Sequence, residues 1–394
     1  MVLNVLGGIR HYVPVTGRRT KPVTEGLASI LSYRVTALIF LLCCVLVTSV
    51  EFVGNGITIS CIQDGHPDYW AIPYHVMNTY CYIMGTFTLP PHHGQDEEVL
   101  HPGVGVYHRG DNEEEYKAYY QWVPFVLFFQ ACAFYFPHSL FKMAEGGKIA
   151  GIISGLHQAE DVLQDQTRAN KYNTLSKYMA KTLNTHNQWA FKMFLCEIFG
   201  FVNILANIYF IDVFLGNEFS QYGVQVALFL NDDQTKRTDP MSRVFPKMTK
   251  CTYNKYGLSG TIQTFDALCM LPVNVMNEKI YVFLWFWLIF LAIINILSLL
   301  YHLLLILHPT ILSAMIKIRV RHNRGLKYII DDITKSFKFG DWRLLHILAY
   351  NMTPIVFGEF LLELDDQFAI KEVQHNSFAN DKQTNRKTPT ITSI

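Results

Sequence analysis

Charged side chains are scarce in this chain of 394 residues. Asp, Glu, Lys and Arg make up 16% of it, against roughly 25% in typical soluble domains, and the mean hydropathy is positive at +0.16. The formal net charge is only +1, so the chain lacks the global basic field of a nucleic-acid-binding protein. It also lacks the low hydrophobicity and high net charge of a disordered regulator. These absences favour a polytopic membrane protein.

Signatures of catalysis and of metal binding are missing as well. The sequence has no G-x-S-x-G, no P-loop and no H-E-x-x-H motif. The run Gly146-Gly147-Lys148 lacks the upstream glycine of a phosphate-binding loop. The eight cysteines include no C-x-x-C pair of the kind that holds zinc. We therefore expect no enzymatic activity, no cofactor and no metal site.

Four stretches are long and apolar enough to cross about 30 Å of hydrocarbon, which takes roughly 20 helical residues. They are residues 33–53, 121–141, 190–215 and 279–307. The third is the weakest prediction, because Glu197 and Asp212 fall within it. Residues 1–32 show no cleavable signal peptide, so we expect the first span to be an uncleaved anchor.

Lysine and arginine are distributed unevenly over the segments between these spans. Residues 1–32, 142–189 and 308–394 hold 22 of them, whereas residues 54–120 and 216–278 hold 8. Positively charged residues are retained on the cytoplasmic side of a membrane. We therefore expect both termini to be cytoplasmic, and the loops at 54–120 and 216–278 to be external.

The eight cysteines follow the same division. Four lie within the predicted spans, at Cys43, Cys44, Cys132 and Cys196. The other four lie in the predicted external loops, with Cys61 and Cys81 in the first and Cys251 and Cys269 in the second. Stable disulfides form outside the cytosol, so we expect these four to be disulfide-bonded. The sequence alone leaves all three pairings of four cysteines open.

A distinctive run of five residues stands at the start of the second span, Tyr119, Tyr120, Gln121, Trp122 and Val123. This YYQWV signature resembles the innexins, the invertebrate gap-junction proteins. Further segments are similar to that family, namely VGNGITISC (53–61), NTYC (78–81), LNTHN (183–187), FPKMTKC (245–251) and LPVNVMNEKIYVFLWFW (271–287). The similarity covers about residues 1–345 and has an arthropod-like character.

The resemblance implies an all-α polytopic membrane protein whose four-transmembrane-helix bundle is one subunit of a large-pore ring. It implies that the segment 1–32 lies at the pore mouth and that residues 308–371 form a helical cytoplasmic region. It also implies disulfides between Cys61 and Cys269 and between Cys81 and Cys251, which link the external loops. Residues 372–394 are polar, and we expect them to be disordered.

The resemblance also implies the partners and the location of the protein. Rings of like or different innexin subunits lie in the plasma membrane at gap junctions. Two rings in apposed membranes dock through their external loops and pass ions and small metabolites between adjacent cells.

The first span carries a stripe of small and polar residues at helical spacing. Its members lie three or four positions apart and are Arg34, Ala37, Leu41, Cys44, Thr48 and Glu51. The opposite side, including Ile39, Phe40 and Leu46, is bulky. In one interpretation the stripe lines the pore, with Arg34 at the inner mouth and Glu51 at the outer mouth. In the other, its small residues pack against a neighbouring helix and its charges lie at the membrane surface.

Two charged regions outside the spans are open to two interpretations each. The first external loop has acidic runs at 96–98 and 113–115 and six histidines; these either favour cations or form a solvated surface. A basic cluster follows the fourth span, at Lys317, Arg319, Arg321, Arg324 and Lys327. It either binds anionic membrane lipids or covers a solvated cytoplasmic helix.

The leading functional hypothesis is therefore a subunit of a gap-junction channel. An alternative is an unpaired plasma-membrane channel that releases small molecules, as pannexins do. A less favoured alternative is a four-span adhesion or scaffold protein resembling claudins, but the W-GLW-C-C pattern of that family is absent.

Overall fold

The computed structural model describes residues 24–53, 59–63, 72–89, 103–105, 114–153, 165–231, 239–320 and 326–385. The chain divides into two compact units. Unit 1 contains Leu31–Phe136 and Gly200–Asn295. Unit 2 contains Pro137–Phe199 and the chain from Ile296 onward, together with residues 24–30.

Four helical stretches are long and apolar enough to cross a membrane. In the first, Leu27–Val50, α2 (Leu27–Ile30) and a π-helical turn η1 (Leu31–Val35) lead into α3 (Thr36–Val53). The others are α5 (Val123–Glu145), α8 (Asn187–Phe214) and α11 (Val273–Leu307). They overlap the four spans predicted from the sequence, and the predicted four-helix fold class is confirmed. At 1.5 Å per residue, the 35 residues of α11 extend about 52 Å, which is longer than the hydrocarbon layer.

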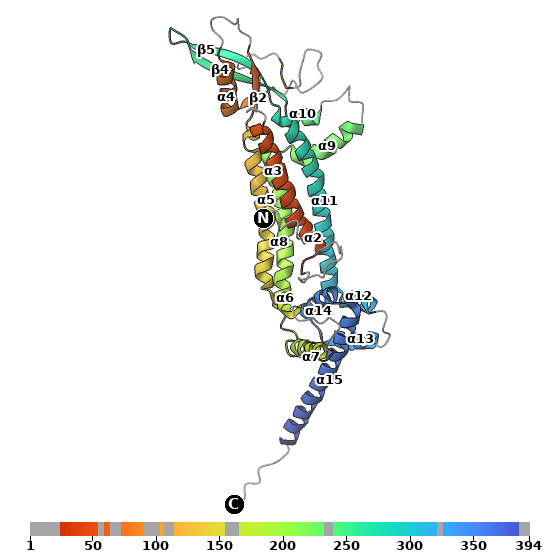
Figure 1. Cartoon of the computed structure of the whole chain (residues 1–394). Helices are drawn as coiled ribbons and strands as arrows, with labels where there is room; N and C mark the ends of the chain where they lie inside the picture. Colours follow the sequence, from red (N-terminus) through yellow and green to blue (C-terminus); the bar gives the residue numbers. More distant parts are fainter. Residues whose placement is uncertain are drawn as a thin grey trace, which may run out of the picture. The chain divides into compact units, whose positions relative to one another are not determined.

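In unit 1 the long helices pack through a continuous apolar core. Figure 1 shows α3, α5, α8 and α11 lying alongside one another. Phe40 of α3 stacks on Phe134 of α5, with ring centroids 5.3 Å apart. Two hydrogen bonds also link α11 to the first span. Asn295 Nδ2 donates to Ser32 Oγ at 2.9 Å, and Trp287 Nε1 donates to Thr36 Oγ1 at 3.0 Å.

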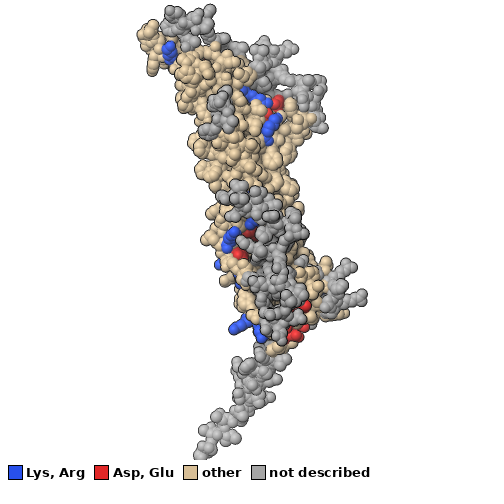
Figure 2. All heavy atoms as spheres, viewed as in Figure 1, with Lys and Arg blue, Asp and Glu red and all other residues tan. Residues whose placement is uncertain are grey.

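The outward surface of these helices is apolar. Exposed phenylalanines stand on α5, α8 and α11, among them Phe128, Phe210 and Phe286. On the face drawn in Figure 2, charged side chains gather in a few patches and the surface over the helices of unit 1 is almost free of them. Such a surface suits lipid or the helices of a neighbouring subunit.

A five-stranded antiparallel sheet joins the two segments that we predict to be external. Its order is β1-β5-β4-β2-β3. The strands are β1 (Ser60–Ile62), β2 (Thr86–Thr88), β3 (Glu115–Lys117), β4 (Met248–Tyr256) and β5 (Ile262–Met270). The first three come from the loop at 54–120 and the last two from the loop at 216–278, so the loops fold as one body. This sheet was not predicted from the sequence, and the all-α description holds for the membrane helices rather than for the loops.

Short helices complete the loop body. They are α4 (Tyr74–Met84), a 3-10 turn η3 (Tyr119–Gln121), α9 (Phe219–Asn231) and α10 (Pro240–Val244). The turn between β4 and β5 needs a glycine at Gly260, whose φ is +80°, because an L side chain is strained there.

Unit 2 has a helical core of its own. Besides the ends of the long helices it contains α6 (Lys148–Ile153), α7 (Asp165–Lys181), α12 (Pro309–Arg319), α13 (Leu326–Ser336), α14 (Phe339–Asn351) and α15 (Pro354–Asn385). The fully buried Phe357 and Phe360 of α15 lie in this core. α15 runs to Asn385, into the segment 372–394 for which we expect disorder. The chain has no proline or further glycine between Gly358 and Pro389, so nothing in the sequence breaks the helix there.

The LNTHN segment (183–187) forms the turn that leads into α8, and hydrogen bonds hold this turn against α14. His186 Nδ1 lies 2.9 Å from a carboxylate oxygen of Asp341, and both side chains are 1% exposed. The other oxygen of Asp341 accepts the backbone N–H of Asn184 at 2.9 Å. The Asn187 side chain accepts the backbone N–H of Gly340 at 2.8 Å.

Glu197, one of the two acidic residues that weaken the third predicted span, is paired within unit 2. Its carboxylate lies 2.5 Å from Arg343 Nη2 and 2.7 Å from His302 Nδ1. A buried carboxylate needs such partners, and α14 and α11 supply them.

We predict that Gly340→Ala destabilises unit 2. A Cβ at this position would lie 2.3 Å from the carbonyl carbon of His186 and 2.4 Å from the amide nitrogen of Asn187. Both neighbours are backbone atoms, so α14 would have to move away, at a cost of about 1–3 kcal/mol. Thermal unfolding of the detergent-solubilised protein should show a lower Tm. Gly151→Ala in α6 is the control, because its Cβ meets nothing within 4 Å; equal Tm values for the two variants would contradict the prediction.

Candidate functional site: the disulfide-linked loop body

Two disulfides join the loops at 54–120 and 216–278. Cys61 on β1 is bonded to Cys269 on β5, and these two residues are also direct partners in the strand register. Cys81 near the end of α4 is bonded to Cys251 on β4. The structure thus contains the pairing that the family resemblance implies. Each bond links one loop to the other, so neither loop can move independently at this point.

The sulfur atoms of the two disulfides lie close together in the interior. The Sγ atoms of Cys61, Cys81 and Cys269 are all within 4.8 Å of one another, and the three residues are buried. Within the described residues this is the one His, Cys, Asp or Glu group whose ligand atoms converge as a metal site requires. Its thiols are all consumed in disulfides, so they are not available as metal ligands.

The YYQWV run fastens the start of α5 to the end of α4. Gln121 Nε2 donates to the backbone carbonyl of Tyr82, one residue beyond Cys81. The rings of Tyr82 and Tyr120 lie 5.6 Å apart, and burial raises the pKa of Tyr120 to about 12. Val123 is fully buried as α5 begins, whereas Trp122 is 60% exposed. The YYQWV motif therefore mainly connects a membrane helix, α5, to the loop body.

An aromatic cluster beneath the sheet gathers side chains from four segments of the chain. Phe245, just after α10, lies 5.6 Å from Tyr119, 5.7 Å from Tyr222 of α9 and 5.3 Å from Tyr281 of α11, measured between ring centroids. All four side chains are largely or wholly buried. Burial raises the pKa of Tyr119 and of Tyr222 well above the ordinary value, so these phenols stay neutral at physiological pH.

Polar contacts fix the FPKMTKC segment (245–251) to the start of α11. Asn274 Nδ2 donates to the carbonyl of Pro246 at 2.7 Å. Glu278 is 1% exposed, and its carboxylate pairs with Lys247 and Lys279, each at 3.1 Å. A buried carboxylate without a cation would be strongly destabilising, and the lysine that precedes β4 and the one on α11 supply the compensating charge.

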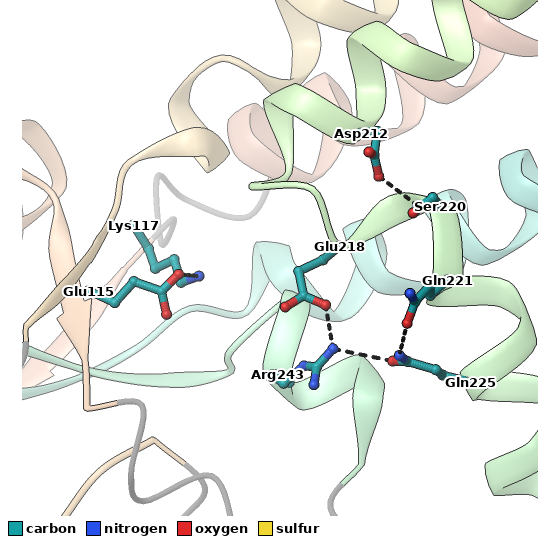
Figure 3. A network of polar contacts seen from close by, with 8 residues as sticks. All are labelled: Glu115, Lys117, Asp212, Glu218, Ser220, Gln221, Gln225 and Arg243. Carbon is teal, nitrogen blue, oxygen red and sulfur yellow. Dashed lines mark hydrogen bonds and ion pairs between the residues drawn. The ribbon is translucent and has the colours of Figure 1, made fainter.

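Asp212, the second acidic residue of the third predicted span, stabilises the beginning of α9. Its carboxylate accepts the backbone N–H of Ser220 at 2.7 Å, which satisfies an amide at the helix N-terminus. Beyond it, Arg243 of α10 pairs with Glu218 and donates to Gln225 Oε1 at 3.3 Å (Figure 3). This network was not predicted from the sequence, because Asp212 and Arg243 are 31 positions apart.

The candidate pore-lining stripe of the first span does not coincide with the exposed face of α3. Ala37 is 7% exposed and lies in the core of unit 1. Cys44 Sγ lies 3.4 Å from the carbonyl of Pro124 at the start of α5, and the hydroxyl of Thr48 donates to the carbonyl of Cys44. Arg34 lies over the ring of Tyr33, and Leu41 packs against the core.

These contacts correct the assumption about the two sides of α3. Phe40, which belongs to the bulky side opposite the stripe, is fully buried, and the exposed side chains are Leu42, Val45, Leu46 and Val50. Helical spacing identifies a row of small residues, but small residues equally allow two helices to approach closely. Ala37 and Cys44 therefore follow the packing interpretation.

Several residues singled out in the sequence lie outside the described part of the chain. They are the N-terminal segment up to residue 23, the acidic run 96–98, His66, His92, His93, His101, His108, Arg321 and Arg324. The side chains of Glu51, Arg319 and Lys327 are likewise not described.

Comparison with known proteins gives a consistent result. The family model described as innexin matches residues 27–368. Innexin inx2 of Schistocerca americana is 42% identical over 87% of this chain and 93% of its own length. Innexin inx3 of Drosophila melanogaster is 40% identical over 92% of this chain and 89% of its own length. Innexin shaking-B of Drosophila melanogaster is 35% identical over 92% of this chain and 94% of its own length.

We predict that Cys81→Ser destabilises the loop body. Removing a native disulfide costs about 2–5 kcal/mol in small disulfide-bonded domains, and here it also frees α4 from β4. The Tm of the purified protein should fall, whereas Cys132→Ser, which removes an exposed free thiol of α5, should leave it unchanged. Peptide mass mapping of the unreduced wild-type protein tests the pairing directly. Free thiols at these four cysteines, or bonds within one loop, would contradict it.

Proposed function

The chain belongs to the innexin family, whose members are gap-junction channel proteins, and we propose that it forms a ring with further innexin subunits. The ring docks with a second ring in the membrane of the adjacent cell, and the paired channel passes ions and small metabolites. The observation that carries this proposal is the extent of the family match, which includes all four long helices and both disulfides.

The proposed arrangement in the plasma membrane has both termini in the cytoplasm and the loop body outside. The distribution of Lys and Arg supports it, with 22 in the proposed cytoplasmic segments and 8 in the two loops. The disulfides support it independently. Cys61–Cys269 and Cys81–Cys251 lie in the loop body, and such bonds persist outside the cytosol.

We propose that the tip of the β4–β5 hairpin contacts the docked ring. Its apolar side chains project from the loop body, with Tyr256 76%, Leu258 98% and Ile262 66% exposed. Almost complete exposure of a leucine is costly in water, and the disulfide at Cys269 anchors the strand that carries Ile262. An apolar tip on a rigid hairpin suits contact with the equally rigid loop body of an apposed subunit.

The corresponding prediction is that Leu258→Asp abolishes dye transfer between paired cells but preserves dye uptake by single cells. A charge at the tip must be desolvated on docking, whereas a single undocked ring leaves it in water. Leu258→Met, which keeps an apolar side chain, is the matched control and should retain transfer. Normal transfer by Leu258→Asp would rule out the tip as a docking contact.

The same measurement separates the two channel hypotheses. If the wild-type protein supports uptake by single cells and never supports transfer between paired cells, the unpaired channel that releases small molecules is the better description. Loss of both activities in Leu258→Asp alone would indicate a folding defect in that variant, and cell-surface labelling identifies such a defect.

We also propose that α3 contributes its exposed edge, around Val45 and Leu46, to the pore wall. Among the described side chains, those that α3 exposes are aliphatic, whereas α5, α8 and α11 each expose phenylalanines. Large aromatic side chains suit lipid, and the smaller aliphatic ones leave more room for metabolites. We therefore propose this edge as the pore lining in place of Ala37 and Cys44, which pack inside the subunit.

We predict that Val45→Cys reacts with a small charged thiol reagent and loses current, whereas Ala37→Cys and Phe40→Cys do not react. The reagent enters water-filled space and is excluded from the packed core. The free span cysteines Cys43, Cys44, Cys132 and Cys196 are first replaced by alanine. Reaction at Ala37→Cys together with no reaction at Val45→Cys would show instead that the stripe identified by helical spacing lines the pore.

A further inference from the structure

We propose that α12 (Pro309–Arg319) binds anionic phospholipid in the inner leaflet of the membrane. One apolar face of the helix lies among the acyl chains, and the basic residues that follow it contact the headgroups. The assignment to the inner leaflet rests on the sidedness proposed above, whereas the binding of an anionic lipid surface does not.

The side chains of α12 divide into a buried face and an exposed face. Ser313 and Ile316 are 7% and 2% exposed, and Val320, just past the end of the helix, is 4% exposed. Ile316 and Val320 belong to the core of unit 2, where α12 contacts α13 and α14. This side fixes the orientation of α12 on unit 2.

The opposite face of α12 is apolar. Its members follow the i, i+3, i+4, i+7 spacing of one side of a helix, and they are Ile311, Ala314, Met315 and Ile318. Ile311 and Ile318 are 41% and 70% exposed. The polar Thr310 and Lys317 lie seven positions apart and share one flank of the helix. Among the described side chains of α12, no polar one therefore interrupts the apolar face.

The length of α11 places α12 at the depth of the lipid headgroups. Residues 280–307 contain no Asp, Glu, Lys or Arg and extend about 42 Å as a helix. This length matches the roughly 40–45 Å of a bilayer with its headgroup regions. His308, with φ −125° and ψ 81°, then interrupts the helix, and α12 starts in a new direction (Figure 1).

The apolar face of α12 continues the exposed surface of the last turns of α11. Tyr301 Oη donates to Met315 Sδ at 3.4 Å, so Met315 lies beside the side of α11 that carries Tyr301. Leu297, Leu300 and Leu304 lie on that side, three or four positions from Tyr301 or next to it, and are 59%, 50% and 50% exposed. The exposed face of α12 thus extends a surface that belongs to a membrane helix, and this continuity favours lipid as its partner.

Positive charge follows the apolar face. The chain contains no acidic residue between Glu278 and Asp331. Lys317 pairs with Asp331 of α13 at 2.5 Å, and residues 318–330 hold four further basic residues and no acidic one, namely Arg319, Arg321, Arg324 and Lys327. An apolar helix face followed by lysine and arginine, directly after a membrane span, is the pattern that binds anionic lipid. The charge therefore selects an anionic headgroup over a neutral one.

The test is a spin-label accessibility measurement on the full-length protein in nanodiscs of phosphatidylcholine and phosphatidylserine. The four free cysteines are replaced by alanine and both disulfides are kept. Single nitroxides are attached at Ile311→Cys and Ile318→Cys, with Leu297→Cys as the lipid reference and Leu258→Cys as the water reference. Collision rates with oxygen, which partitions into lipid, and with a neutral nickel chelate, which stays in water, are measured by power saturation.

We expect the labels at Ile311 and Ile318 to resemble the label at Leu297. Their oxygen collision rates should be several-fold higher, and their nickel collision rates several-fold lower, than those of the label at Leu258. Nickel accessibility equal to that at Leu258 would show that the face is in water and would overturn the proposal. Low accessibility to both reagents would show that protein covers the face, which would overturn it equally.

A change of lipid and a change of charge test the headgroup contact. In nanodiscs of phosphatidylcholine alone, the nickel collision rate at Ile318 should rise several-fold, because the basic residues lose their counter-charge. The combined variant Arg319→Gln, Arg321→Gln and Arg324→Gln should give the same rise with phosphatidylserine present. Lys177→Gln with Lys181→Gln, which removes exposed charges of α7, is the control and should give no rise.

An unchanged rate at Ile318 in both the neutral nanodiscs and the arginine variant would overturn the binding of anionic headgroups. The measurement uses no dye transfer and no current. Its failure is therefore distinguishable from a failure of the proposed channel function.

Discussion

Two disulfides close the chain across 208 and 170 residues, and the arrangement of the loop body depends on them. Cys61 and Cys269 face each other in the strand register, so the bond fixes how β1 lies on β5. The second bond sets α4 against β4, and Gln121 then connects the end of α4 to the start of α5. Bringing together such distant segments costs considerable chain entropy. A covalent bond offsets much of that cost for strands of only three residues, which are too short to pair stably alone.

The acidic residues in and beside the long helices have a common role, which is to attach other elements to these helices. Asp212 stabilises the N-terminus of α9, Glu278 binds the lysine that precedes β4, and Glu197 pairs with Arg343 of α14. The carboxylates of Glu197 and Glu278 are largely buried and pair with cations, because an unpaired charge there would be too costly. Asp212 is half-buried and accepts a backbone N–H instead. Residues that weaken a hydropathy profile are here the attachment points of the polar parts of the protein.

The hairpin tip and α9 are two parts of the loop body with different supports. The tip around Leu258 is carried by β4 and β5, and the disulfides at Cys251 and Cys269 anchor these two strands. Helix α9 lies against Trp285 of α11, whose ring would meet any side chain at Gly223. The tip therefore projects from a sheet, whereas the position of α9 is set by a membrane helix.

The sequence by itself indicated four apolar stretches that fold as long helices, the family, and the four cysteines that form disulfides. These are local properties, since a run of apolar residues such as 279–307 is readable without knowing its neighbours. The sheet was not predictable, because β1, β2 and β3 each have three residues and their partners lie far away in the chain. The two sides of α3 were decided only by packing. Ala37 and Cys44 have the spacing and size of pore-lining residues, but the tertiary structure places α5 and the subunit core against them and leaves Val45 exposed, because a helix presents its small residues wherever a neighbouring helix must come close.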